Sequence, residues 1–175
     1  MNDRDPTGEL DPRFSSDDGK PTLWQAARGE LEIAKAYWLS TVRPDGRPHV
    51  TTIAAVWLDD AVYFTTGQSE RKARNLAANA HVVLTTGCRD FDGLDVVVEG
   101  EAVRVTDEAM LRRVAAAYPP KYGDMFVFTV DDGRMHTEGA EDEALAFRVR
   151  ATKAFGFQKG KTFSQTRWRF WGPSR

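Results

Sequence analysis

The feature that most constrains the fold is a series of short apolar runs separated by tight-turn residues. Runs rich in β-branched and aromatic residues, bounded by Gly, Pro and Asp, are typical of strands joined by hairpins. A PDG turn at 44–46 separates YWLSTV from the extended run 47–58, and a DDG turn at 131–133 separates MFVFTV from RMHTEG. Few helices are interposed between these runs, so the pattern favours an antiparallel barrel or sandwich over a doubly wound parallel sheet.

The remaining pattern predicts about eight or nine strands and a few short helices, hence a mainly β protein. The further strands are expected in AVYFTT, HVVLTTG, LDVVVEGEAVRV, ALAFRVRA, KAFGFQ and TRWRF. Helical spacing is found at 22–36, directly after Ser69, and at 106–118. Residues 1–21 contain few large apolar side chains and are predicted to form a disordered N-terminal tail. One folded domain is then expected over 22–175.

The charge balance argues against a nucleic-acid partner. The chain of 175 residues carries 24 Lys plus Arg and 26 Asp plus Glu, and residues 22–175 carry 21 and 20. A body so close to neutral has no global field for gathering nucleic acid, so any anion site must be local.

The same sequence predicts a cytoplasmic protein with no membrane association. No window approaches the roughly 20 apolar residues that span a bilayer, and the opening MNDRDPTGEL lacks the pattern of a secretory signal. The single cysteine, Cys88, cannot form an internal disulfide, which fits a reducing compartment.

The segment most suggestive of chemistry follows the strand that ends at Thr65 and Thr66. Ser69 is predicted to cap a helix whose opening turn, ERKAR, carries three cations and one acid. Cations at a helix start are disfavoured by roughly 0.3 to 1 kcal/mol each, because the free N–H groups there are already positive. A phosphate held by the N–H groups, the hydroxyls and Arg71 or Lys72 would remove that cost. A solvated basic turn without a ligand is the alternative.

A second group of polar residues begins the run 47–58. His49 and Thr51 share one face with apolar residues further along, and Thr52 lies on the other face, so the early end is predicted to open onto a polar pocket. His81 and His136 lack the spacing of metal-binding motifs, and no metal site is predicted. No nucleophile elbow or acid–base pair is found, so no catalytic residue is assigned.

Five segments in order, YWLSTVRPDGRPHV, LDDAVYFTTG, SERKARNLA, VVVEGEAVRV and AFGF...TRWRF, resemble the pyridoxamine 5'-phosphate oxidase-like split β-barrel proteins. The likeness covers roughly 23–171 and is greatest to the actinobacterial flavin and deazaflavin oxidoreductase branch. The resemblance implies an antiparallel split β-barrel with short helices. It also implies a homodimer that binds FMN, or coenzyme F-420 in one branch, at the subunit interface.

The resemblance also implies a set of cofactor-binding residues. The phosphate would be held by Thr65, Thr66, Ser69, Arg71 and Lys72, and the ring system would lie beside His49, Thr51 and Thr52. Lys72 and Asn75 are candidates for either cofactor, and Arg167 or Trp168 would close the pocket. From the strand pattern alone, Trp168 is expected to pack in the core or in a subunit interface.

With such a cofactor the protein would be an oxidoreductase that transfers hydride to or from a small organic substrate. The alternative is a non-catalytic protein that binds or carries a flavin, a deazaflavin or haem, with His49 as the haem ligand. True pyridoxamine phosphate oxidases carry an arginine and a histidine two residues apart near the C-terminus. Here that stretch reads Arg167-Trp168-Arg169, and the missing histidine argues against vitamin B6 oxidation.

Overall fold

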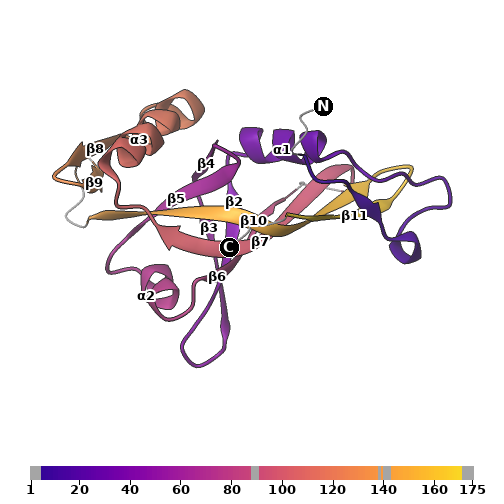
Figure 1. The fold of residues 1–175 in the computed structure, drawn as a ribbon, viewed down its shortest axis with the longest axis horizontal. Helices are drawn as coiled ribbons and strands as arrows, with labels where there is room; N and C mark the ends of the chain where they lie inside the picture. The colour runs from indigo at the N-terminus through magenta and orange to yellow at the C-terminus, as the bar shows by residue number, and fades with distance from the viewer. Residues whose placement is uncertain (1–4, 88–90, 138, 140–142, 171–175) are drawn as a thin grey trace.

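The computed structural model describes residues 5–87, 91–137, 139 and 143–170. Within these residues all strand pairs are antiparallel, and the predicted split β-barrel is confirmed (Figure 1). The strands are β1 (Glu9–Leu10), β2 (Tyr37–Val42), β3 (Pro48–Ile53), β4 (Ala55–Leu58), β5 (Ala61–Gly67), β6 (His81–Thr86), β7 (Gly93–Arg104), β8 (Phe128–Asp131), β9 (Arg134–Thr137), β10 (Ala144–Lys159) and β11 (Ser164–Arg169). The helices are α1 (Trp24–Ile33), α2 (Arg71–Ala78) and α3 (Glu108–Tyr122), with 3-10 turns η1 (Pro12–Phe14) and η2 (Gly123–Met125).

The long strand β10 divides the sheet. One edge of β10 pairs with β7 along nearly its whole length, with a register shift between Ala151 and Lys153. The other edge pairs with β5 over its first part and with β11 over its last part. Because β5 and β11 share one edge of a single strand, the sheet separates into two arms around the barrel.

Two apolar clusters fill the molecule, one inside the barrel and one beneath α3. Alternation along β5 places Phe64 in the barrel cluster and Tyr63 in the other. The barrel cluster also contains Trp24 of α1, which packs edge-on against Trp168 with ring centroids 5.4 Å apart. Helix α3 covers the outer side of β4 and β5 through Leu111 and contributes to the second cluster.

The N-terminal segment differs from the predicted disordered tail. Strand β1 pairs with β11, placing Glu9 opposite Arg167, and the backbone N–H of Asp11 donates to the Gln165 carbonyl at 2.8 Å. Gly8 lies so close to the Trp168 ring that a Cβ would lie 2.9 Å from its Nε1. Counting apolar side chains overlooks the edge of β11, which binds Glu9, Leu10 and Asp11 through the backbone.

Several predicted boundaries also change. The extended run 47–58 is two strands, because β3 ends at Ile53 and β4 begins at Ala55. The cap of α2 is Glu70 rather than Ser69, and α1 ends at Ile33 instead of reaching residue 36. Helix α3 continues through two prolines to Tyr122, beyond the predicted end at 118.

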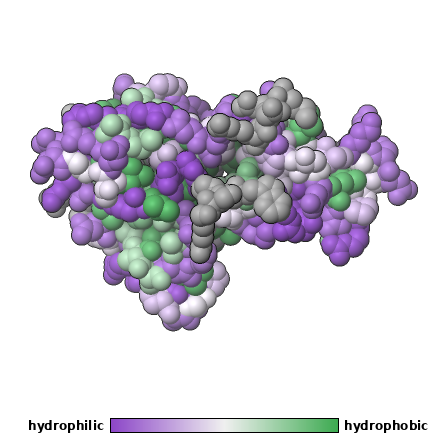
Figure 2. Space-filling view, in the orientation of Figure 1, coloured by the Kyte–Doolittle hydropathy of each residue, from purple (hydrophilic) through white to green (hydrophobic). Residues whose placement is uncertain are grey.

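The surface seen in the view of Figure 1 is largely hydrophilic, with hydrophobic residues gathered in patches (Figure 2). In the described part of the chain, none of the helices has the length and apolar character needed to cross a lipid bilayer. Figure 1 shows α3 and the β8–β9 hairpin at one end of the molecule and the β1–β11 edge at the other.

Candidate functional site

Two adjoining cavities form one groove between β3, β5, α2 and the segment that follows α3. One cavity has a volume of about 480 Å³ and the other about 660 Å³. They share five lining residues, which are Thr52, Ile53, Ala54, Met125 and Phe126. Cavities of this size are typical of small-molecule sites. Hereafter the end at α2 is called the α2 corner, and the end at Lys35 and Lys121 is called the lysine end.

The α2 corner gathers hydrogen-bond donors onto a single carboxylate. The Glu70 carboxylate accepts from the backbone N–H of Gly67 at 2.8 Å, from Thr66 Oγ1 at 3.2 Å and from Lys72 Nζ. Lys72 is 8% exposed, whereas the Glu70 side chain is 46% exposed. Burial raises the pKa of Glu70, but the hydrogen bonds from Lys72 and Gly67 outweigh it and the net pKa is lowered. An internal anion therefore occupies the place where the sequence predicted a phosphate.

His49 lies beside this corner in a mostly positive environment. Burial lowers the pKa of His49, and the charges of Arg43, Lys72 and Arg71 lower it further. His49 Nδ1 lies 3.3 Å from Thr41 Oγ1, which in turn accepts from Asn75 Nδ2 at 2.9 Å. This chain of contacts joins β3, β2 and α2.

Buried polar atoms without a partner lie in the same hairpin and helix. Three of the four found among the described residues are here, namely Arg43 Nε, Thr51 Oγ1 and Asn75 Oδ1, and the fourth is Trp168 Nε1 in the barrel core. A buried polar atom without a hydrogen bond costs roughly 1 to 3 kcal/mol, so three of them in adjoining elements are a departure from ordinary packing. Such a departure is typical of regions that bind something else.

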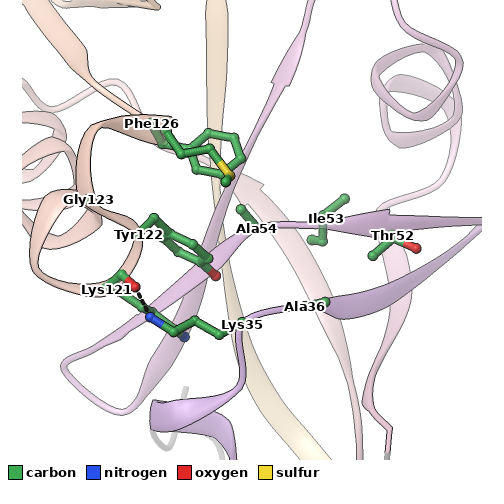
Figure 3. Close-up of a pocket in the computed structure, with 10 residues that line it drawn as sticks. Lys35, Ala36, Thr52, Ile53, Ala54, Lys121, Tyr122, Gly123 and Phe126 are labelled. Carbon is green, nitrogen blue, oxygen red and sulfur yellow. Dashed lines mark hydrogen bonds between the residues drawn. The ribbon is translucent and has the colours of Figure 1, made fainter. Parts of the chain in front are cut away.

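The lysine end is built from three separate segments. Lys121, at the end of α3, donates to the Ala55 carbonyl at 2.9 Å and to the Tyr37 hydroxyl at 3.3 Å. Lys35 Nζ donates to the backbone carbonyl of Lys121, as the dashed line in Figure 3 shows. Figure 3 also shows Tyr122 beside these lysines and Thr52 at the opposite side of the cavity. Burial, and then the charge of Lys35, lowers the pKa of Lys121 to about 8.

Four of the eleven predicted cofactor residues line the groove, and five others lie in the adjoining β3 and α2 segments without lining either cavity. Thr52, Thr65, Thr66 and Lys72 line the α2 corner of the groove. Arg71 opens α2 and acts electrostatically on His49, which is linked to Asn75 through Thr41. Thr51 follows His49 on the inward side of β3, and Ser69 lies just before the helix, where its carbonyl accepts from Arg74 at 2.8 Å.

Within one chain, Arg167 and Trp168 lie away from this groove. Arg167 pairs with Phe155 on β10, whereas Thr66 pairs with Leu145, ten residues earlier on the same strand. That separation is roughly 30 Å along an extended strand. Trp168 is fully buried in the barrel core, which bears out its expected packing role and removes it from the groove. Arg167 forms an ion pair with Glu9.

The structure also adds residues that the sequence did not identify. Glu70 was counted as a charge of the first turn, and Arg43 was not considered. Lys121 and Tyr122 lie beyond the predicted end of their helix, and Lys35 is 86 residues away from its carbonyl partner. A basic residue after two prolines was the available signal for Lys121, but nothing local indicates what it contacts.

Among the described residues, no group of three or more His, Cys, Asp or Glu is arranged to hold a metal ion. Cys88, the single cysteine, lies outside the described residues.

Comparison with known proteins places these features in a family. The family model described as pyridoxamine 5'-phosphate oxidase matches residues 23–156. A pyridoxine/pyridoxamine 5'-phosphate oxidase from Bacteroides thetaiotaomicron is 32% identical over 87 residues. That stretch spans 49% of this chain and only 40% of the relative.

Two solved structures show the same fold at lower identity. An F420 reductase has 24% identity and a TM-score of 0.53, over 73% of this chain and 94% of that one. The haem storage protein HutZ from Vibrio cholerae has 19% identity and a TM-score of 0.56, over 79% and 92%. Because the family model covers more than half of the sequence, the chain belongs to the pyridoxamine 5'-phosphate oxidase family.

Proposed function

We propose that this protein is an oxidoreductase that binds FMN, or alternatively coenzyme F-420, with the cofactor phosphate at the α2 corner. The observation that carries the proposal is the convergence of Thr66, Gly67 and Lys72 on one anion at the entrance of the groove. These donors are the kinds that bind phosphate, and Arg71 and Arg43 add positive charge nearby. Family membership supports the same assignment.

The donor set fits a phosphate once Glu70 moves away. The Glu70 side chain is half exposed, so it can turn towards solvent, whereas Lys72 is held in the buried first turn of α2. The ring would then lie at the α2 end of the shared stretch, beside Thr52 and Ile53. Bound flavin or deazaflavin supplies the hydride chemistry. The chain binds and orients it, and the apolar walls exclude water.

Substrate specificity is expected to differ from vitamin B6 oxidation. The relative that bears that name matches over 40% of its own length, and the C-terminal Arg167-Trp168-Arg169 lacks the expected histidine. We therefore propose a small conjugated organic substrate that stacks on the ring.

We further propose a homodimer in which Arg167 of one protomer reaches the groove of its partner. Within one chain Arg167 lies far from the α2 corner, so only a second copy could bring it there. Trp38 and Val50 are each 51% exposed on the adjoining strands β2 and β3, and such an apolar surface suits a subunit contact. Sedimentation at micromolar concentration tests this: a monomer contradicts the interface.

A carrier function is the second candidate, and His49 is the observation that favours it. Burial and the neighbouring cations lower the pKa of His49, and neutral imidazole is the form that binds haem iron. Absorption spectra separate the two functions. A yellow protein that bleaches with NAD(P)H or a reduced deazaflavin, and recovers with an acceptor, is an enzyme. Colour without turnover, or a haem Soret band lost in His49→Ala, favours the carrier.

Binding of FMN to the Lys72→Met variant tests the proposed phosphate site. Loss of a charge-assisted hydrogen bond of about 1.5 to 3 kcal/mol should weaken FMN binding by roughly 10- to 150-fold. FMN fluorescence measures the affinity, and riboflavin, which lacks the phosphate, should bind both proteins equally. Lys161→Met, at an exposed position between β10 and β11, is the matched control. Equal FMN affinity in Lys72→Met and wild type would remove the phosphate from this corner.

A further inference from the structure

The lysine end of the groove contains two ammonium groups whose partners are all neutral among the residues that the structure describes. Lys121 Nζ contacts the Ala55 carbonyl and the Tyr37 hydroxyl, and Lys35 Nζ contacts a backbone carbonyl. Lys121 Nζ also lies 5.1 Å from the ring centroid of Tyr37 and 5.6 Å from that of Tyr122. Carbonyl and aromatic groups orient an ammonium group without neutralising it.

Among the described residues, no carboxylate lies within 4.0 Å of either ammonium group. Glu32 acts on Lys121 electrostatically, but it pairs with Arg28, whose Nε lies 3.4 Å from Glu32 Oε1. Two neighbouring cations thus remain at one end of a partly buried cavity. Burial and mutual repulsion make that arrangement unfavourable, and an anion placed between or beside them would relieve both costs.

The walls of the cavity define the rest of the ligand. Tyr122, Phe126, Ile53 and Ala54 give the cavity apolar and aromatic sides, and the opening towards Thr52 joins it to the α2 corner. A flat apolar body fits between such walls, with a single polar group directed at the lysines.

We infer that Lys121 and Lys35 bind the carboxylate of a planar substrate whose conjugated body lies between Tyr122, Phe126 and Ala54. This inference rests on the proposed function, because it assigns the substrate class of the same groove. Lys121 would give the stronger contact because it is the more buried of the two, and Lys35, which is exposed, would add a weaker one. The proposed substrate class is therefore an aromatic or conjugated carboxylic acid.

The probe for the experiment is benzoate, with benzamide as its neutral counterpart of nearly the same shape. Titrations of the full chain are followed by amide NMR at pH 7. Benzoate should bind at least about 10-fold more tightly than benzamide and should shift signals of Lys121 and Tyr122, since only the carboxylate accepts charge-assisted bonds from both lysines. Equal binding of the two probes, or benzoate shifts confined to Gly67 and Lys72, would overturn the inference.

Variants assign the effect to the two lysines. Lys121→Met should weaken benzoate binding by about 10-fold or more and leave benzamide unchanged, whereas Lys121→Arg should retain benzoate binding. Lys35→Met changes an exposed residue, so it still tests the site if Lys121→Met fails to fold. It should weaken benzoate binding several-fold. Lys161→Met should leave the affinities for benzoate and benzamide unchanged. Unaltered benzoate affinity in Lys35→Met and Lys121→Met would remove the site.

FMN titration of the same samples separates this inference from the proposed function. Lys121→Met should leave FMN affinity nearly unchanged, because the phosphate is assigned to the other end of the groove. If benzoate binds through the lysines and FMN does not bind, the proposed function fails and the carboxylate site stands. If FMN binds and benzoate does not, the carboxylate site alone is contradicted.

Discussion

The α2 corner and the lysine end belong to one groove, yet their cations have opposite partners. At the α2 corner, Lys72 is paired with the carboxylate of Glu70, which also takes the Gly67 N–H. At the lysine end, the partners of Lys121 and Lys35 among the described residues are carbonyl and phenol groups. Within the part of the chain that the structure describes, the first cation has an internal anion and the second pair has none.

This difference separates two ways of preparing a site for a charged ligand. A cation with an internal carboxylate is already neutralised, so a ligand anion must displace that carboxylate. The ligand then gains only the difference between its own interaction free energy with the cation and that of the carboxylate. A cation with neutral partners remains unneutralised, so a ligand anion gains the full interaction. We therefore expect a dianionic phosphate to be needed at the α2 corner, whereas a carboxylate suffices at the lysine end.

The largest effect is expected when the lysine end is given an internal carboxylate. Met125 lines the same cavity and is 74% exposed, so Met125→Glu can place an acid near the lysines without disturbing the core. Benzoate affinity should fall by at least about 10-fold, because the new carboxylate competes for the same ammonium groups. Met125→Gln, which has the same shape without the charge, should bind benzoate like wild type. If Met125→Glu kept the benzoate affinity of the wild type, the absence of an internal acid would not be the reason that the lysine end binds a carboxylate.

The converse change makes the α2 corner resemble the lysine end. Glu70→Gln removes the internal anion and keeps an oxygen that can accept from Gly67. FMN should bind about 5- to 10-fold more tightly in the FMN fluorescence assay, because the phosphate no longer competes with a charged group. Glu101→Gln is the control, since that exposed acid pairs with His81 outside the groove. Weaker FMN binding in Glu70→Gln would mean that Glu70 supports the ligand instead of competing with it.

The parts of this molecule that could be predicted from sequence are those set by local chemistry. The PDG and DDG turns lie between paired strands, and Gly46, Asp132 and Gly133 adopt the positive φ angles that such turns require. The α2 corner could be predicted as a candidate site because its threonines, cations and helix start are neighbours in sequence. Because such residues are close together in sequence, short segments were enough to show the resemblance to a family.

The lysine end could not be predicted, because its residues meet only through the fold. Lys35 follows α1, Ala55 begins β4 and Lys121 ends α3. Helix α3 reaches Lys121 by continuing through Pro119 and Pro120, against the usual breaking effect of proline. The sequence also could not predict that the Glu70 carboxylate is the anion at the α2 corner, because this depends on the orientation of the Glu70 side chain.

The smallest expected effect concerns stability, and it tests whether the lysine end is unneutralised before any ligand binds. The pKa of Lys121 in the folded chain is lowered to about 8 from an ordinary value of 10.5. Between these values the unfolded chain holds a proton that the folded chain has released, so Lys121 makes the free energy of unfolding rise with pH. Lys121→Met should lack this rise, which partial exposure limits to about 1 kcal/mol. Urea unfolding from pH 7 to 10.5 measures the difference, with Lys161→Met as control. Parallel curves for wild type and Lys121→Met would mean that water solvates Lys121 as fully as a surface lysine. The contrast between the two ends of the groove would then be lost.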